Sequence, residues 1–349
     1  MALYVDMEKR LGAFRLRVKF ETGDGLFALL GASGCGKSVT LRCIAGLMTP
    51  DRGRIVLNGR VLFDSERRID LSPQQRRVGY LFQSYALFPR MTVLQNVMAG
   101  LHALPRKQRQ AAALEQLRLF RLEHRKDSLP ADLSGGEQQR AALARLLAAK
   151  PEALLLDEPF SALDDHLQWQ LELDMKQTLA DYRGDVILVT HSRDQVCRMA
   201  KEVCVLTAGQ SEPVQSVLEL MRSPGTVSAA LLSGCKNLSA ARITGRGRVF
   251  CEDWGWELEA GREIPPGCRF VGVRAHSLRP DAERNRLACT VEQVIDNVFS
   301  YILMLKTPGP GRLRMERSKE GFDPPEPGSA MTVGAAPEEI LLLTGGPEP

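Results

Sequence analysis

The sequence GASGCGKS, from Gly31 to Ser38, decides the fold because it lies between an apolar run, Leu26–Leu30, and an apolar-periodic stretch, Val39–Leu47. Its glycines let backbone N–H groups converge on phosphate oxygens, and the helix that follows would direct its positive end at the same phosphates. Lys37 can then reach the β- and γ-phosphates, and Ser38 can ligate Mg²⁺. A purely structural glycine turn is the weaker alternative, because both the strand and the helix are in place. The predicted phosphate-binding residues are Gly31, Ala32, Ser33, Gly34, Cys35, Gly36, Lys37, Ser38 and Val39.

A pair of acidic residues follows a second apolar strand in LLLDEP, Leu154 to Pro159. The strand would deliver Asp157 to its carboxyl end, where Mg²⁺ is held in phosphate-transferring proteins. Glu158 stands next to it and can act on the attacking water. The alternative is a plain helix start, since helix N-termini favour carboxylates. Its position downstream of a phosphate loop favours the catalytic interpretation.

A second glycine-bearing turn opens an amphipathic helix in LSGGEQQRAALARLL, Leu133 to Leu147. Ser134 offers a hydroxyl, and Gly135 and Gly136 offer bare backbone, which together suit a phosphate. In isolation a simple N-cap followed by flexible glycines is the better interpretation.

The rest of the chain predicts an α/β architecture. RIVLNGRVLFD, residues 54–64, alternates like a hairpin with Asn58-Gly59 at its turn. Short buried strands, such as Asp185–Thr190, alternate with helices, which implies a doubly wound core. We expect a helical subdomain at about residues 92–150. Composition changes near residues 222–234, so we expect a first domain over 1–235 and a small β-barrel-like domain over 236–349.

Composition excludes several classes of protein. A chain of 349 residues suits two domains, and a net charge of +4 argues against a dedicated nucleic-acid binder. Eight cysteines without a C-x-x-C pair predict reduced thiols and no zinc site. No apolar stretch approaches the roughly 18 to 20 residues that span a bilayer, and the N-terminus carries charges where a signal peptide would be apolar. We therefore expect a chain that serves a membrane only by docking on other subunits.

Taken in order, these motifs resemble those of the ABC ATPase family. LSGGEQQR is similar to that family's signature motif, and Gln83 in YLFQSYALFP to the glutamine of its Q-loop, which touches Mg²⁺ or water. The stretch Ser161–Asp164 resembles the D-loop, which crosses the dimer interface. His191 in LVTHS resembles the switch histidine, which contacts the γ-phosphate. The resemblance covers about residues 1–235, and its six motifs occur in the family's order.

The resemblance implies an ATP hydrolase with a P-loop NTPase core, using ATP and Mg²⁺, that works as a head-to-tail dimer with a second copy of itself. The signature of one copy would serve the nucleotide bound by the other, which suits isologous contact. By resemblance, the catalytic residues are Glu158, His191 and Gln83, the metal ligands are Ser38, Gln83 and Asp157, and the nucleotide contacts in trans are Ser134, Gly135, Gly136, Glu137 and Asp164.

Three positions depart from the family pattern or leave it open. Glu137 stands where glutamine is common in the signature. Val39 replaces a second hydroxyl residue, which removes one α-phosphate hydrogen bond worth about 0.5–1.5 kcal/mol and predicts weaker ATP binding. Phe14 is the candidate for stacking on adenine, although a core phenylalanine is at least as good an interpretation.

The resemblance also implies partners. Transmembrane permease subunits would dock near Gln83–Asn96, which is apolar and aromatic enough to receive a short helix, although an ordinary subdomain seam is the alternative. The chain would then lie at the cytoplasmic face of the membrane and act indirectly with an extracytoplasmic solute-binding protein.

The region GRVLFDSERRIDLSPQQRRVGYLFQSYALFP and the C-terminal phrases GCKNLSAARI, VGVRAHSLRP and PEEILLL are similar to sulfate and molybdate importer ATPases. The tail resembles their OB-like barrel, and either a regulatory oxyanion site or a dimerisation module is open. Import of sugars, polyamines or ferric iron is the alternative cargo, and a non-transport ABC ATPase is a further one. A single-strand nucleic-acid reader would need Trp254, Trp256 and Arg246 as platforms in a basic groove. The absence of a long coiled coil or a second ATPase half argues against the non-transport class.

Overall fold

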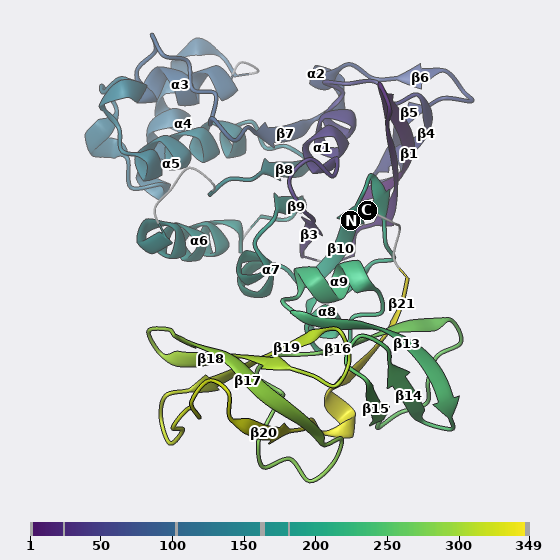
Figure 1. Ribbon diagram of the computed structural model, residues 1–349. Helices are drawn as coiled ribbons and strands as arrows, with labels where there is room; N and C mark the ends of the chain where they lie inside the picture. Colours follow the sequence, from purple (N-terminus) through teal and green to yellow (C-terminus); the bar gives the residue numbers. More distant parts are fainter. Residues whose placement is uncertain (1–2, 24, 102–103, 161–164, 181, 346–349) are drawn as a thin grey trace. The chain divides into compact units, whose positions relative to one another are not determined.

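The computed structural model describes the chain apart from residues 1–2, 24, 102–103, 161–164, 181 and 346–349 (Figure 1). It divides into two compact units, Met1–Val217 and Leu218–Pro349. This division falls 18 residues before the boundary that was predicted after residue 235. Helices α8 (Val217–Arg222) and α9 (Val227–Leu232) are held within the second unit, where Arg274 donates hydrogen bonds to Met221 O at 2.6 Å and Ser233 O at 2.8 Å.

The core of the first unit is a parallel sheet with strand order β10-β3-β9-β8-β7. Every residue of β8 and β9 is buried, which explains why these strands read as unbroken apolar runs instead of alternating patterns. Because the strands are parallel, their carboxyl ends meet at one edge of the sheet, where the loops that follow β3, β8 and β9 come together. The strands are β3 (Leu26–Leu30), β7 (Val78–Leu81), β8 (Ala153–Asp157), β9 (Asp185–Thr190) and β10 (Glu202–Thr207).

A mostly antiparallel arm continues this sheet in the order β6-β5-β4-β1-β2-β11, in which only β11 pairs with its neighbour β2 in parallel, and β12 pairs with β10. The predicted hairpin is present, with Asn58 at φ 51° and Gly59 at φ 78°. Positive φ at both positions is what an Asn-Gly two-residue turn requires. The strands are β1 (Leu3–Leu11), β2 (Phe14–Glu21), β4 (Arg52–Leu57), β5 (Arg60–Asp64), β6 (Ile69–Asp70), β11 (Gln210–Ser211) and β12 (Gln215–Ser216).

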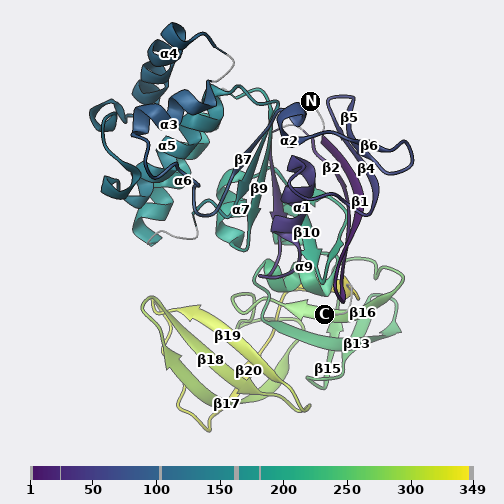
Figure 2. The same cartoon turned by 90° about the horizontal axis from the view of Figure 1, so that it is seen from above.

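Helices α3–α6 form a group beyond the β7 edge of the sheet (Figures 1 and 2). They share a buried cluster that includes Val97, Leu117, Leu143 and Leu171. In the described part of the chain, no helix has the length and apolar character needed to cross a membrane. The helices of this unit are α1 (Lys37–Ala45), α2 (Pro73–Arg76), α3 (Val93–Gly100), α4 (Arg106–Leu119), α5 (Gly135–Ala148), α6 (Asp165–Leu179) and α7 (Arg193–Met199), with 3₁₀ turns at Glu123–Arg125 and Pro130–Asp132.

The second unit holds two antiparallel sheets, β15-β14-β13-β16-β21 and β19-β18-β17-β20, around one apolar core. This β-rich build agrees with the predicted OB-like domain. Trp254 and Trp256 are 1% and 2% exposed, so they cannot serve as stacking platforms for nucleic acid. The elements are β13 (Asn237–Gly245), β14 (Arg248–Cys251), β15 (Trp256–Glu259), β16 (Cys268–Val273), β17 (Leu287–Asp296), β18 (Ser300–Lys306), β19 (Arg312–Ser318), β20 (Ala330–Val333) and β21 (Ile340–Thr344), with a 3₁₀ turn at Pro337–Glu339.

Candidate functional site

The phosphate loop leaves β3 after Leu30 and enters α1 at Lys37. Gly36 caps the helix with φ 108°, and a Cβ added there would lie 2.5 Å from Leu16 Cδ1, so both conformation and space require glycine. The Lys37 side chain folds back beneath the loop and is 4% exposed. Its ammonium donates hydrogen bonds to Gly31 O and Ala32 O, each at 2.8 Å. The loop is thus closed around a buried ammonium group that donates to two of the loop's own carbonyl groups.

Asp157, at the end of β8, is held by two hydroxyl groups. Ser38 Oγ donates to Asp157 Oδ1 at 2.7 Å, and Tyr80 Oη donates to Asp157 Oδ2 at 2.7 Å. Burial, together with the hydrogen bond to Asp157, raises the pKa of Tyr80, so this side chain remains a neutral donor. Sequence reasoning missed Tyr80. The signal was a hydroxyl-bearing residue inside the apolar strand β7, which pairs in parallel with β8.

Glu158 lies between Lys37 and His191. Its Oε1 is 3.6 Å from Lys37 Nζ, and its Oε2 is 3.4 Å from His191 Nδ1. The backbone places it there with φ 44°, while its N–H donates to Val189 O at 3.1 Å. A non-glycine residue at this φ is strained, and such strain gathers at functional sites. Glu158 stands well before α6 begins, so the alternative of a plain helix start does not describe it.

The signature turn is a capped helix start. Ser134 accepts a hydrogen bond from Glu137 N at 3.3 Å, and Glu137 Oε2 accepts one from Ser134 N at 2.9 Å, which is a capping box. Glu137 Oε1 also accepts from Arg125 Nε at 2.9 Å. The pKa of Glu137 is lowered mainly by the hydrogen bond from the Ser134 N–H, and further by Arg125. The N-cap interpretation of Ser134 is therefore correct for the isolated chain, and Glu137 orders the turn.

The structure brings together five of the predicted residues, namely Lys37, Ser38, Asp157, Glu158 and His191. Among the described residues, no hydrogen bond or ion pair joins Ser134–Glu137 to the phosphate loop. Gln83 is exposed in the turn after β7. Asp164, with the rest of the D-loop, lies outside the described residues.

Phe14 and Val39 are half-buried and pack against the core of the first unit. The Phe14 ring also borders the phosphate loop, since its Cζ would lie 3.4 Å from a Cβ added at Gly36. This position leaves both interpretations of Phe14 open, a core residue and an adenine contact.

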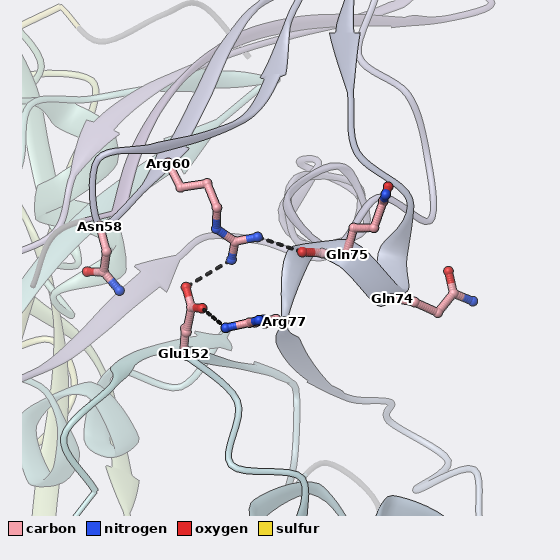
Figure 3. Close-up of a pocket in the computed structure, with 6 residues that line it drawn as sticks. All are labelled: Asn58, Arg60, Gln74, Gln75, Arg77 and Glu152. Carbon is pink, nitrogen blue, oxygen red and sulfur yellow. Dashed lines mark hydrogen bonds and ion pairs between the residues drawn. The ribbon is translucent and has the colours of Figure 1, made fainter. Parts of the chain in front are cut away.

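A polar pocket of about 690 Å³ lies elsewhere in the first unit, between the β4–β5 turn, α2 and the residue that precedes β8 (Figure 3). Arg60 donates to Gln75 O at 2.6 Å and to Glu152 Oε2 at 2.9 Å, and Arg77 Nη1 is 3.4 Å from Glu152 Oε1. Its charges are thus paired with one another. It lies at the amino ends of β7 and β8, at the opposite end of these strands from Asp157, so it is separate from the phosphate site.

Comparison with known proteins assigns the fold and the family. The model of the ABC transporter family matches residues 15–161. The chain is 36% identical to the molybdenum import ATP-binding protein ModC of Rhodospirillum rubrum over 79% of this chain and 70% of that one. It is 39% identical to the sulfate/thiosulfate import ATP-binding protein CysA of Thermosynechococcus vestitus, over 91% and 90%. It is 37% identical to the spermidine/putrescine import ATP-binding protein PotA of Acidothermus cellulolyticus, over 77% and 72%.

A solved structure is similar as well. It is a dimeric, post-hydrolysis state of the ATP-binding cassette MJ0796 bound to ADP and Pi, with a TM-score of 0.52 and 26% identity, covering 62% of this chain and 99% of that one. The family match and these relatives support the same assignment as the geometry of the phosphate loop and of Glu158. The chain belongs to the ABC transporter family, as an ATP-binding, ATP-hydrolysing subunit of the importer type.

Proposed function

We propose that this chain hydrolyses Mg²⁺-bound ATP in a dimer of two copies and thereby drives import of a small oxyanion, molybdate or sulfate. The observation that carries the catalytic part is the position of Glu158, within 3.6 Å of Lys37 Nζ and 3.4 Å of His191 Nδ1. A carboxylate held between a phosphate-binding lysine and a histidine is placed to polarise the attacking water.

Lys37 would exchange its two backbone acceptors for phosphate oxygens. Its ammonium now donates to Gly31 O and Ala32 O, so nucleotide binding replaces neutral acceptors by charged ones without creating an unsatisfied donor. His191, which lies across Glu158 from Lys37, would contact the γ-phosphate. Val39 offers no hydroxyl to the α-phosphate, which costs about 0.5–1.5 kcal/mol of binding free energy.

The pair Ser38 and Asp157 fits Mg²⁺. A hydroxyl and a carboxylate 2.7 Å apart supply the hard oxygen ligands that this ion takes, and Gln83 is the further candidate ligand. In the described residues, no group of three or more His, Cys, Asp or Glu side chains forms a self-contained metal site, which suits an ion that is held largely by the nucleotide. When bound, the ion would neutralise charge on the phosphates.

A second copy would complete the nucleotide site. Ser134, Gly135 and Gly136 form an exposed or half-exposed turn, and Glu137 holds that turn in shape. Presented to the nucleotide of a partner, the turn would offer a hydroxyl and backbone N–H groups at a helix N-terminus. The contribution of Asp164 at the same interface stays a prediction from resemblance.

The membrane side would be the surface around Gln83–Asn96. Phe88 and Met91 are 45% and 40% exposed there, which suits docking of a short helix from a permease. The chain would then be peripheral on the cytoplasmic face of the membrane, with an extracytoplasmic solute-binding protein as an indirect partner.

The solute is proposed from the relatives. Two of them are named for molybdenum and for sulfate or thiosulfate, and the similarity to the sulfate relative reaches through the C-terminal unit. Spermidine and putrescine, for which a third relative is named, form the alternative class of solute.

Calorimetric titration of the purified chain with molybdate, tungstate and sulfate tests whether the C-terminal unit is regulatory. Absence of heat with all three favours a spacing or dimerisation module.

The Glu158→Gln variant tests the catalytic proposal. It keeps the shape of the side chain but removes the base, so turnover should fall at least about 100-fold while an ATP-bound dimer accumulates. Turnover is measured by phosphate release, and the dimer by light scattering with and without Mg²⁺–ATP. Hydrolysis at the parent rate would contradict the role of Glu158, and a variant that stays monomeric with ATP would contradict the dimer.

A further inference from the structure

The loop that follows β7 is fastened to the signature helix by Arg145. This residue lies on α5, the helix that Ser134 begins. Its guanidinium donates to Ala86 O at 2.8 Å and to Tyr85 O at 3.1 Å. The same guanidinium lies over the ring of Phe88, 5.2 Å from its centroid. One side chain thus contacts three residues of the loop, Tyr85, Ala86 and Phe88.

The held carbonyls belong to strained backbone. Tyr85 has φ 60° and Ala86 has φ 45°, so two consecutive non-glycine residues adopt the left-handed conformation. Such a conformation persists where the surroundings over-determine it. A planar guanidinium with two parallel N–H donors can hold two neighbouring carbonyls at once, and an ammonium cannot reproduce that geometry.

A second contact ties the same loop to the helical group. Asn96 of α3 is fully buried and accepts from Phe88 N at 2.8 Å while its amide donates to Phe88 O, Met91 O and Thr92 O. Helix α3 in turn lies directly on α5, because a Cβ added at Gly100 would be 2.2 Å from Arg145 O. The loop is therefore anchored to α3 and α5.

The loop also touches the hydrolysis site. Tyr85 is 5% exposed, and its hydroxyl donates to Pro159 O at 3.3 Å. Pro159 immediately follows Glu158. The buried Tyr85 therefore has its carbonyl held by the signature helix and its hydroxyl held by the segment that carries the water-polarising carboxylate.

We infer that Arg145 is a positioning residue that makes the surface loop Ser84–Met91 follow the signature helix α5 when ATP binds. The inference rests on the proposed function, because it takes ATP-driven closure of a dimer as the event that moves α5. The loop carries the exposed Phe88 and Met91, so movement of α5 would displace the surface at which the permease is proposed to dock. Arg145 acts through the loop and does not contact nucleotide in this account.

The test is hydrogen–deuterium exchange of the full chain in the Glu158→Gln background, read on peptides covering Ser84–Met91. Addition of Mg²⁺–ATP should slow exchange of this loop by about threefold or more, since closure tightens the segment that α5 holds. With Arg145→Lys added, the nucleotide-dependent change in this loop should be lost while the ATP-bound dimer still forms. Arg118→Gln, an exposed arginine on α4 that pairs with Glu123 at 3.0 Å, is the matched control and should retain the change.

The outcomes separate the two proposals. A loop that responds to ATP as strongly in Arg145→Lys as in the parent overturns the inference, and so does a parent dimer whose loop does not respond. Failure of the Glu158→Gln chain to form any ATP-bound dimer overturns the proposed function itself. Arg145→Met provides a second variant, in which retention of the response would also refute the role of Arg145. A merely structural role would change the loop's exchange equally with and without nucleotide.

Discussion

The phosphate loop and the signature turn are both glycine-bearing helix starts, yet they are built in opposite ways. At the phosphate loop, Lys37 is 4% exposed and its ammonium is held by Gly31 O and Ala32 O. At the signature turn, Ser134 is exposed and its hydroxyl caps its own helix. The phosphate loop finds its hydrogen-bond partners within one chain, whereas the signature turn is ordered but faces the surface. Under the proposed function, the chain preforms both halves of a nucleotide site that a second copy then completes.

The C-terminal end of α1 is also held within the core. Arg76 is fully buried and donates to Cys43 O at 2.6 Å, Ile44 O at 2.9 Å and Leu71 O at 2.8 Å, which caps the last turn of α1. The helix that follows the phosphate loop is therefore fixed at both ends within the core.

Replacement of Arg76 by alanine should have the largest effect. Arg76→Ala leaves buried carbonyls unsatisfied and a cavity behind, so the free energy of unfolding should fall by about 3 kcal/mol. Urea denaturation followed by circular dichroism measures it. Arg77→Ala is the neighbouring control, because the Arg77 side chain is 73% exposed, and should change stability by less than about 0.5–1 kcal/mol. Equal losses in both variants would show that α1 is not anchored as described.

Removal of Lys37 should come next. Lys37→Ala deletes charge-assisted hydrogen bonds to the phosphates, so the Kd for Mg²⁺–ATP should rise about 100-fold, or about 2.7 kcal/mol. Isothermal titration calorimetry measures it, with the exposed Lys19→Ala as the control. Unchanged affinity would mean that Lys37 serves the loop's carbonyls alone.

The Ser134→Ala variant should distinguish the role of the signature turn from that of the phosphate loop. Nucleotide binding to the isolated chain should stay at the parent level, while turnover of the dimer should fall about tenfold, because the second copy loses a hydroxyl contact worth about 1.4 kcal/mol. Phosphate release at saturating ATP is the measurement. Thr226→Ala, which removes the N-cap of α9, controls for loss of a cap and should leave turnover intact. Reduced ATP affinity in the Ser134 variant would break the comparison.

Glu137→Gln should have the smallest effect. The Ser134 N–H and then Arg125 lower the pKa of Glu137 below its usual value of 4.5, so the carboxylate stabilises the turn above that pH and loses this contribution as the pH falls through its lowered pKa. Glutamine keeps the hydrogen bond to Ser134 but not the charge. Stability at pH 7 should fall by about 0.5 kcal/mol, with a flatter pH dependence in the acid range. Thermal unfolding from pH 3 to pH 7 checks it, and an identical pH profile would contradict the assignment.

Much of the catalytic half could be predicted from the sequence. The strands Leu26–Leu30 and Asp185–Thr190 have the bounds that the sequence predicts, because complete or nearly complete burial leaves apolar runs between polar loops. The convergence of Lys37, Asp157 and Glu158 follows, since carboxyl ends of parallel strands meet at one edge.

The residues that support the site could not be found in this way. Tyr80, Arg76 and Arg145 act on atoms that are 77, 33 and 60 residues away, which no local pattern encodes. The same is true of the domain boundary, which depends on Arg274 reaching Met221 and Ser233. The burial of Trp254 and Trp256 likewise depends on how two sheets close over one core.

The attachment of α8 and α9 to the C-terminal unit has a consequence for how this protein can be recombined. A chimaera joined just before α8, next to the unit boundary at Val217, would keep both helices with the unit that holds them, whereas a junction after residue 235 would divide them from Arg274. Exchange of tails between importers at the earlier junction would therefore transplant a folded sensor or spacer whole, and the grafted pump would inherit whatever response that tail carries.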